Sequence, residues 1–473
     1  MSDEKEIKTA QKILEEDLGK ESLYPMKSII AEEMKDNIKK IVQFETAEKI
    51  LGKIIDKNDL ARKFIDVMPL YYDEAQNWWR WDLIDFYWRI TDETDILLFI
   101  DNACDTNVIG SKDRTELLNA LKLRARARKP KEITKTMIQF GKEIVDVQTG
   151  DRFPASHKYF VTNPVPFKIG TSPDTSKFDK LFGSWVNEKD VPCLYEIVAY
   201  CLLPDYPIER MFALLGSGSN GKSTYLKILY TFLGMKNICT TNLELLTRSR
   251  FETARLFKKL ACVMGETNLA QLNESQLIKR LTSGKDPIPV EFKNKGLMDF
   301  ISYAKLIIAT NNLPQTDDKT DGFYRRWRII DFPNQFEKEI DVLGDLTTED
   351  FENLAAKCLI TLCDVMKNRG FTGDGTIADR RKRYEDKSNP FDKFWDEFIS
   401  IENPDSDIPI WEFRDEVNNY MKANHARTVS DKEISRLMKE KGIQPGVKKL
   451  NWTESTDGKS KAFRIWMGLS WRK

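Results

Sequence analysis

Short apolar runs, each followed by a polar or glycine-rich turn, recur through the middle of this chain. Met211 to Leu215 is an uninterrupted apolar run, and Thr224 to Leu233 after it carries apolar residues at helical spacing. Two further stretches, Leu260 to Met264 and Lys305 to Thr310, are rich in apolar residues and predict buried strands. Strands and helices in this order predict an α/β fold, with a parallel sheet flanked by helices.

The turn between the first strand and its helix carries candidate chemistry. Its sequence, GSGSNGKS, fits GxxxxGK[ST] without a mismatch. Glycines let backbone N–H groups wrap a phosphate chain, and the helix N-terminus faces the anion. Lys222 would reach the β- and γ-phosphates, and the Ser223 hydroxyl would reach Mg²⁺. The expected nucleotide-binding residues are Gly216, Ser217, Gly218, Ser219, Asn220, Gly221, Lys222, Ser223 and Thr224.

Polar residues follow the other two predicted strands. Glu266 lies 44 residues after Lys222, and Asn311 lies 45 residues after Glu266. An acid at a strand end can hold Mg²⁺ or orient the attacking water, and an amide can sit beside the γ-phosphate. Parallel strands end at one edge of a sheet, where α/β proteins bind ligands. The sequence therefore predicts ATP and Mg²⁺ as ligands, with Ser223 and Glu266 as the metal-binding residues.

These residues, in this order, resemble the superfamily 3 helicases, with a closer likeness to the primase-helicases of phages, plasmids and poxviruses. The family's A, B, B′ and C motifs match GSGSNGKST, LACVMGET, LIKRLTSGKDPIPVEFKNK and KLIIATNNLP. GFYRRWRIIDF resembles the arginine-rich segment, and IQFGKEIVDVQTGDRFPASHKYFVTNPVPF resembles the end of the preceding domain. The likeness covers about Ile138 to Phe332 and implies an AAA+-like P-loop ATPase core that forms a ring, as a hexamer.

One departure from the family concerns motif B. Many members carry two adjacent acids there, whereas Gly265 precedes a single Glu266 in this chain. It stays open whether Glu266 binds the metal, activates water or does both.

Three arginines, Arg325, Arg326 and Arg328, follow a loop rich in Asp and Lys. A guanidinium that reaches the γ-phosphate of a neighbouring subunit stabilises charge in the transition state and is worth ~10³–10⁵ in rate. We expect Arg326 to be this finger, with Arg325 as the alternative. Arg328 lies on a predicted strand, which favours a structural ion pair.

The segment between motifs B and C predicts a hairpin. Ser283 to Pro287 has turn residues, Ile288 to Phe292 alternates like a strand, and a second turn carries Lys293 and Lys295 at its tip. In the family this region projects into the central channel. Lysines there would contact DNA phosphates without reading bases, although a surface hairpin with ordinary lysines is the alternative.

The rest of the chain divides by composition. The expected parts are a charged helical lead over 1–60, an α+β N-terminal domain over 61–175, a helical collar over 176–206, the ATPase over 207–335, a helical segment over 336–402 and a winged helix-turn-helix over 403–473. In the N-terminal domain, Trp78, Trp79, Trp81 and Trp88 favour ordinary core over base stacking. The basic stretch 122–135 is either a solvated helix face or a DNA contact.

The last part predicts two helices followed by a hairpin. Ile410 to Asn424 and Asp431 to Lys441 look helical, with Ser430 as an N-cap. Gly446 to Thr453 and Ala462 to Gly468 look like strands joined by a turn. This order is the pattern of a winged helix.

The same part is locally basic. The last 47 residues hold 12 Lys or Arg against 5 Asp or Glu, in a chain whose 74 basic and 74 acidic residues balance. Because phosphate contacts dominate affinity for DNA, we expect Lys448 and Lys449 to bind DNA. Docking of a protein partner is the alternative.

Composition narrows the remaining classes. A chain of 473 residues with 41% hydrophobic residues can form several domains with real cores. Seven cysteines without CxxC pairing disfavour zinc ribbons and disulfide frameworks, and two histidines leave little for a histidine metal site. The start MSDEKEIKTAQ is not a signal peptide, and no apolar run has membrane-spanning length. We expect a cytoplasmic protein with no membrane contact.

The combined hypothesis is a ring-forming, ATP-dependent DNA helicase in replication of a phage, plasmid or other mobile element. The expected partners are single-stranded and forked DNA, copies of the same chain, and a separate primase or replication-initiation protein. Only the resemblance implies movement from 3′ to 5′. Two alternatives stay open: a DNA-binding regulatory ATPase, and a packaging motor that translocates DNA without separating its strands.

Overall fold

The computed structural model describes residues 57–103, 111–216, 218–265, 271–272, 275–291, 297–337, 343–388, 390–403, 406–423, 428–450 and 461–472. Nearly all of the expected lead, 1–60, lies outside these residues, as do Ser217, Glu266, Lys293 and Lys295. The chain separates into two compact units, Met1–Pro130 and Lys131–Lys473.

The first unit packs helices against a small antiparallel sheet. Its elements are α4 (Lys57–Val67), β1 (Leu70–Tyr72), β2 (Trp78–Asp82), β3 (Tyr87–Thr91), α5 (Glu93–Ala103) and α6 (Ser111–Ala127). The strands pair in the order β1-β2-β3. Trp78, Trp79, Trp81 and Trp88 are all at most 4% exposed, which confirms that they belong to the core.

The boundary at Pro130 divides the expected N-terminal domain, 61–175. Its second half forms β4 (Lys131–Glu132), β5 (Met137–Phe140), β6 (Glu143–Asp146), β7 (Arg152–Pro154) and β8 (Tyr159–Phe160). Phe140, Val145 and Phe167 from this half are buried in the same hydrophobic cluster as the central sheet. This packing explains why the unit boundary falls at Pro130 and not near Thr175.

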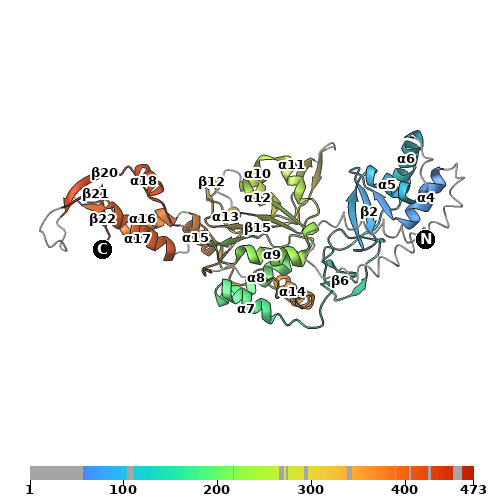
Figure 1. Ribbon diagram of the computed structural model, residues 1–473, viewed down its shortest axis with the longest axis horizontal. Helices are drawn as coiled ribbons and strands as arrows, with labels where there is room; N and C mark the ends of the chain where they lie inside the picture. Colours follow the sequence, from blue (N-terminus) through green and yellow to red (C-terminus); the bar gives the residue numbers. More distant parts are fainter. Residues whose placement is uncertain are drawn as a thin grey trace, which may run out of the picture. The chain divides into compact units, whose positions relative to one another are not determined.

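A five-stranded parallel sheet forms the centre of the second unit (Figure 1). Its strands are β9 (Met211–Leu215), β10 (Ile238–Thr241), β11 (Ala261–Met264), β15 (Lys305–Thr310) and β17 (Trp327–Asp331), in the spatial order β10-β11-β15-β9-β17. Every neighbouring pair is parallel. The expected parallel sheet with flanking helices is therefore confirmed.

Alternate residues of the strands point to opposite faces, and each face has its own core. Phe212 and Leu214 of β9 belong to one cluster, and Met211, Ala213 and Leu215 belong to the other. Both faces are thus covered, which is why these strands are nearly continuous apolar runs.

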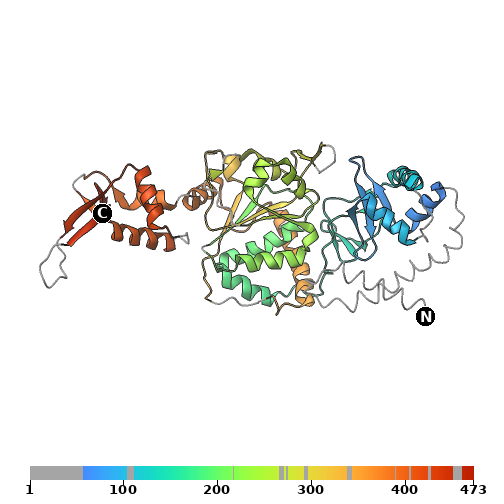
Figure 2. The same cartoon turned by 45° about the horizontal axis from the view of Figure 1, so that its top comes forward.

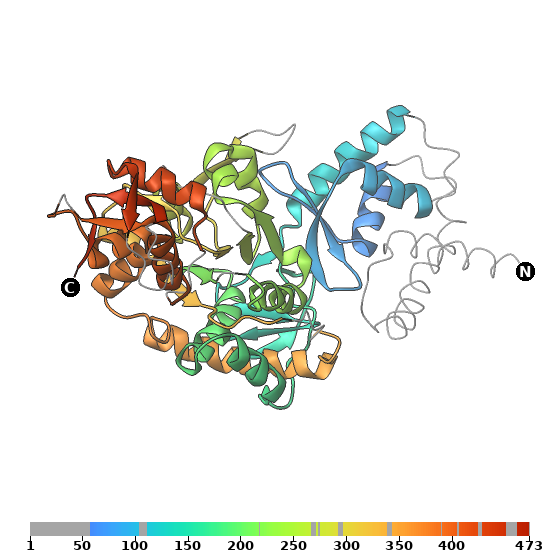
Figure 3. The same ribbon diagram turned by 60° about the vertical axis from the view of Figure 1, so that its left-hand side comes forward.

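Helices far apart in the chain cover the two faces (Figure 2). The first face carries α7 (Ser176–Trp185), α8 (Val191–Cys201), α9 (Lys222–Leu233) and α14 (Thr348–Asn368). The orange α14 lies beside the green α8 although more than 140 residues separate them (Figure 3). The second face carries α10 (Leu243–Arg248), α12 (Ser275–Leu281), α13 (Asp321–Tyr324) and Tyr384 of α15 (Ile377–Ser388). No helix among the described residues has both the length and the apolar character needed to cross a membrane.

Smaller elements complete the region around the sheet. They are α11 (Arg250–Thr253), the parallel pair β12 (Gln271–Leu272) and β16 (Gln315–Thr316), and the antiparallel hairpin β13 (Ile288–Glu291) and β14 (Leu297–Phe300). The predicted hairpin is confirmed, while its tip lies outside the described residues.

The C-terminal part has a core of its own. Its elements are α16 (Pro390–Phe398), β18 (Ile399–Ser400), β19 (Asp407–Pro409), α17 (Ile410–Ala423), α18 (Asp431–Glu440), β20 (Pro445–Leu450), β21 (Lys461–Met467) and β22 (Ser470–Trp471). The three longer strands pair in the order β19-β21-β20. The Ser430 side chain accepts a hydrogen bond from the Glu433 N–H at 3.3 Å, which confirms it as an N-cap.

Candidate functional site

The order of the central strands brings the glycine loop and Asn311 to the same end of the sheet. Strand β15 lies between β11 and β9, so the carboxyl ends of these three strands are neighbours. Asn311 directly follows β15 and is half-buried. The Gly216 N–H donates to the Thr310 carbonyl at 3.3 Å, which ties the start of the glycine loop to the end of β15. Glu266 itself lies outside the described residues, two positions after β11.

The glycine loop adopts a conformation that its sequence permits. Gly218 has φ = 110°, and Gly221 has φ = 90°, both in the left-handed region that favours glycine. Ser219 between them has φ = 47°, a value uncommon for a residue with a side chain. Successive left-handed residues turn the chain sharply, so that several N–H groups can face one anion.

Two close approaches fix the loop against its surroundings. A Cβ atom on Gly216 would come within 2.6 Å of the Phe332 carbonyl oxygen, and one on Gly221 would come within 2.6 Å of the Trp185 ring. Asn220 is buried and donates to the same Phe332 carbonyl at 3.0 Å. The loop is therefore held by α7 and by the segment after β17.

Lys222 begins α9, and its side chain lies inside the loop. The residue is 7% exposed, and its Nζ donates to the Gly216 carbonyl at 2.6 Å and to Asn220 Oδ1 at 2.9 Å. Ser223 is exposed and Thr224 is half-buried, both in the first turn of α9. A helix N-terminus, a buried ammonium group and an exposed hydroxyl thus meet at one point, and this set suits a phosphate group.

Groups that suit a metal ion are few at this edge. Among the described residues, no cluster of three or more His, Cys, Asp or Glu side chains could hold a metal. The Ser223 hydroxyl suits Mg²⁺, which prefers oxygen ligands and is commonly bound by few protein groups plus phosphate oxygens.

Arg325 and Arg326 lie at the opposite end of the strands, where β9 and β17 begin. Arg326 directly precedes β17, and its carbonyl accepts from the Met211 N–H at the start of β9 at 2.7 Å. The glycine loop follows the opposite end of β9. Five strand residues separate the two places, a distance of roughly 16 Å. That separation is larger than the reach of an arginine side chain, so these arginines cannot contact a phosphate in the loop of their own chain.

Arg326 is enclosed by residues of its own chain. Its side chain is 7% exposed. Its Nε donates to Thr282 Oγ1 at 2.8 Å, and the rest of the guanidinium donates to the carbonyls of Gly322 and Lys279. Burial lowers the pKa of Arg326, and Glu209, at 2.9 Å, acts against this shift. These contacts tie β17 to the last turn of α12 and to α13.

Arg325 and Arg328 differ from Arg326 in exposure. The Arg325 side chain is 44% exposed and forms an ion pair with Glu209. The Arg328 side chain is 3% exposed and pairs with Asp190 at 3.4 Å, which confirms the predicted structural ion pair.

The sequence did not point to Glu209. Its carboxylate forms ion pairs with both Arg325 and Arg326, which lie more than 100 residues away along the chain. A single acid in the turn before β9 has no signal of its own, and only the adjacency of β9 and β17 brings the three side chains together.

Several of the side chains that were predicted to bind DNA form contacts within the chain itself. Lys448 is half-exposed and forms an ion pair with Asp407, whereas nothing is described for the Lys449 side chain. In the basic stretch 122–135, Arg126 donates to the backbone carbonyls of Tyr72 and Asp73. Lys122 pairs with Glu93, and Arg128 pairs with Asp66. Much of this positive charge is thus used within the unit.

A family model matches the part of the chain that contains the glycine loop. A family model described as a family of unknown function (DUF5906) matches residues 214–326, from the end of β9 to Arg326. A protein of Acanthamoeba polyphaga mimivirus described as a "putative helicase" is 26% identical over 160 residues. The alignment takes in 32% of this chain and 16% of the viral protein, so the chain matches only a small part of that relative.

Two solved structures resemble the chain at low identity. The A form apo structure of the NrS-1 C-terminal region has a TM-score of 0.45 and 10% identity, and covers 88% of this chain and 100% of that chain. A second apo structure of this region has a TM-score of 0.46 and 12% identity, with the same coverage. Similarity at this level carries no statement about function.

Proposed function

We propose that this protein is an ATP-dependent DNA helicase of the superfamily 3 type, with an AAA+-like ATPase core. One observation carries the proposal: the left-handed glycine loop at the carboxyl end of β9, with buried Lys222 at the start of α9. The 26% identity to a viral protein described as a "putative helicase" supports the same reading.

In this proposal the residues at the carboxyl ends of β9, β11 and β15 have separate roles in ATP binding and hydrolysis. The backbone N–H groups of the loop and Lys222 bind the phosphates, and Asn311 lies beside the γ-phosphate. Glu266 orients the attacking water. Mg²⁺, held through the Ser223 hydroxyl and Glu266, would neutralise charge on the phosphate oxygens. The order β11-β15-β9 supports this division, because it makes the three strand ends neighbours.

The position of Arg325 and Arg326 supports assembly into a ring. Arg325 and Arg326 are too far from their own loop to act on its nucleotide, so an arginine of this pair acts only on the nucleotide of a neighbouring copy. We propose a homo-oligomer, a hexamer, in which the exposed Arg325 serves as the finger. Arg326, the residue favoured by the sequence, would then hold the surrounding structure in place.

DNA contact is assigned to two places. Lys293 and Lys295, at the tip of the hairpin β13–β14, would contact single-stranded DNA in the channel. The C-terminal part would bind duplex DNA as a winged helix, with α18 as the recognition helix. Lys432, Arg436 and Lys439 support this assignment because they are exposed at helical spacing on α18, while Ile434 and Met438 face the core.

Replacement of Lys432, Arg436 and Lys439 by Ala should weaken duplex binding and flatten its salt dependence. Each phosphate contact contributes about 0.9 to the slope of log affinity against log salt concentration. We therefore expect the slope to fall by about 2 to 3 in a fluorescence-anisotropy titration over a salt series.

A control variant removes three exposed lysines elsewhere, Lys180, Lys189 and Lys367. It has the same change in net charge and should keep the slope. Equal slopes for the α18 variant and the wild type would contradict the winged-helix assignment and favour a protein-docking role.

Strand displacement on a forked duplex tests the function itself. The wild type should release the labelled strand only when ATP and Mg²⁺ are present. ATP hydrolysis and movement on DNA without strand release would favour a packaging motor. Hydrolysis that neither moves on nor responds to single-stranded DNA would favour the regulatory ATPase.

A further inference from the structure

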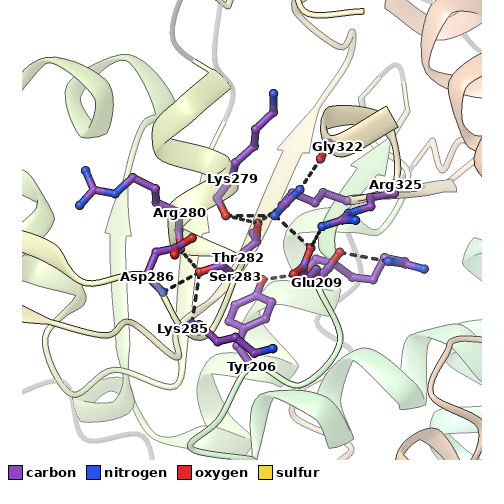
Figure 4. Close-up of polar contacts among 12 residues, drawn as sticks. Tyr206, Glu209, Lys279, Arg280, Thr282, Ser283, Lys285, Asp286, Gly322 and Arg325 are labelled. Carbon is purple, nitrogen blue, oxygen red and sulfur yellow. Dashed lines mark hydrogen bonds and ion pairs between the residues drawn. The ribbon is translucent and has the colours of Figure 1, made fainter. Parts of the chain in front are cut away.

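Glu209 lies beside the exposed Arg325 (Figure 4), and it also pairs with the buried Arg326. The same oxygen, Glu209 Oε2, accepts a hydrogen bond from Arg325 Nη2 and forms an ion pair with Arg326 Nη2. Arg326 is fixed by three further hydrogen bonds, to Thr282, Gly322 and Lys279. The carboxylate is therefore anchored on its inner side and holds the exposed Arg325 on its outer side.

The main chain of Glu209 is also anchored. The Arg210 guanidinium donates to the Glu209 carbonyl at 3.1 Å. The same guanidinium donates to Asp374 from Nε at 3.0 Å and from Nη2 at 2.8 Å, and both side chains are nearly buried. Glu209 is thus held at its backbone and at its carboxylate, so its position is defined before any neighbouring subunit arrives.

We propose that Glu209 is a positioning residue for Arg325, which presents the Arg325 guanidinium at the sheet edge toward the phosphate of a neighbouring copy. This inference rests on the proposed function. A free arginine side chain loses rotamer entropy when it is fixed, and part of that cost is met in advance here. The half-exposed ion pair is worth little by itself, so it guides the guanidinium without outcompeting a phosphate.

The same contacts connect Arg325 to the hairpin. Arg326 holds the last turn of α12, and the turn from α12 to β13 is closed by Ser283 Oγ, which accepts from the N–H groups of Lys285 and Asp286 at 3.2 Å and 2.9 Å. Strand β13 begins at Ile288. The turn before β13, the end of α12, Arg326 and Glu209 are therefore linked by successive contacts, so that a movement of the hairpin can alter the position of Arg325.

A double-mutant cycle tests the inference. Glu209→Gln keeps the shape of the side chain and removes its charge, so kcat for ATP hydrolysis should fall on the order of 10-fold, with KM for ATP unchanged within about 2-fold. In an Arg325→Ala background the same change should cause no further loss in single-turnover rate, because Glu209 acts through Arg325. Glu352→Gln, which removes a carboxylate paired with Lys168, is the matched control and should behave like the wild type.

The outcomes separate this inference from the proposed function. A wild type without ATP turnover would refute the proposed function. If the wild type is active and Arg325→Ala is impaired, but Glu209→Gln has a normal or raised kcat, only the role of Glu209 is overturned. Equal losses in both backgrounds would also overturn it, and this includes the case in which Glu209→Gln does not fold.

Discussion

Replacement of Lys222 by Ala should reduce ATP hydrolysis to background, a loss on the order of 10³-fold or more. Lys222 is 7% exposed, and its ammonium group is the only described side-chain cation with hydrogen bonds to the loop residues Gly216 and Asn220. Without it the developing charge on the phosphates loses its main counter-charge. Release of inorganic phosphate by the purified full chain, with and without single-stranded DNA, measures the effect.

Lys227 offers a matched control on the same helix. It lies on the exposed side of α9, one turn and a half after Lys222, and its replacement by Ala should leave turnover unchanged. Binding of a fluorescent ATP analogue and the thermal midpoint show whether the Lys222→Ala variant is folded. Turnover within a few-fold of the wild type in a folded Lys222→Ala variant would contradict the assignment of the loop.

The sequence predicted the sheet well because its strands are buried on both faces. Met211–Leu215 and Lys305–Thr310 coincide with β9 and β15, since a short apolar run bounded by turn residues is typical of a strand that is buried on both faces. The helix after the loop begins at Lys222, two residues before its first predicted position, because the loop passes into the helix without a separate cap side chain.

Elements that depend on distant partners could not be predicted in this way. Strand β10, Ile238–Thr241, has only four residues, and a run this short shows no periodicity from which a strand could be predicted. The Pro130 boundary follows from the burial of Phe140 and Val145 against the central sheet, which local patterning does not reveal.

The arginines show the same limit at the level of single side chains. Arg325 and Arg326 are adjacent and chemically identical, yet one is 44% exposed and the other 7% exposed at its side chain. The difference arises from Thr282, Lys279 and Gly322, which close around Arg326 only after the chain has folded. The sequence therefore identified the pair and could not rank its members by accessibility.

Replacement of Arg325 by Ala should leave ATP binding intact and lower hydrolysis by ~10³–10⁵-fold. Binding is spared because Arg325 lies at the far end of β9 from the loop of its own chain, whereas hydrolysis in each site depends on the arginine of the neighbour. Mixing Arg325→Ala with Lys222→Ala subunits should restore part of the activity, because some interfaces then combine an intact loop with an intact arginine. Phosphate release across a series of mixing ratios measures this recovery.

The thermal midpoint of Arg326→Ala distinguishes the structural role of Arg326 from the role of Arg325 in hydrolysis. Its removal leaves the carbonyls of Lys279 and Gly322 without the donor they have now, so we expect a lower thermal midpoint of unfolding, whereas Arg325→Ala should unfold like the wild type. If Arg326→Ala instead keeps its midpoint, loses hydrolysis and recovers in mixtures, while Arg325→Ala stays active, then Arg326 is the finger. If no mixture of either variant recovers turnover, the arginines do not act across a subunit interface, and the ring mechanism is wrong.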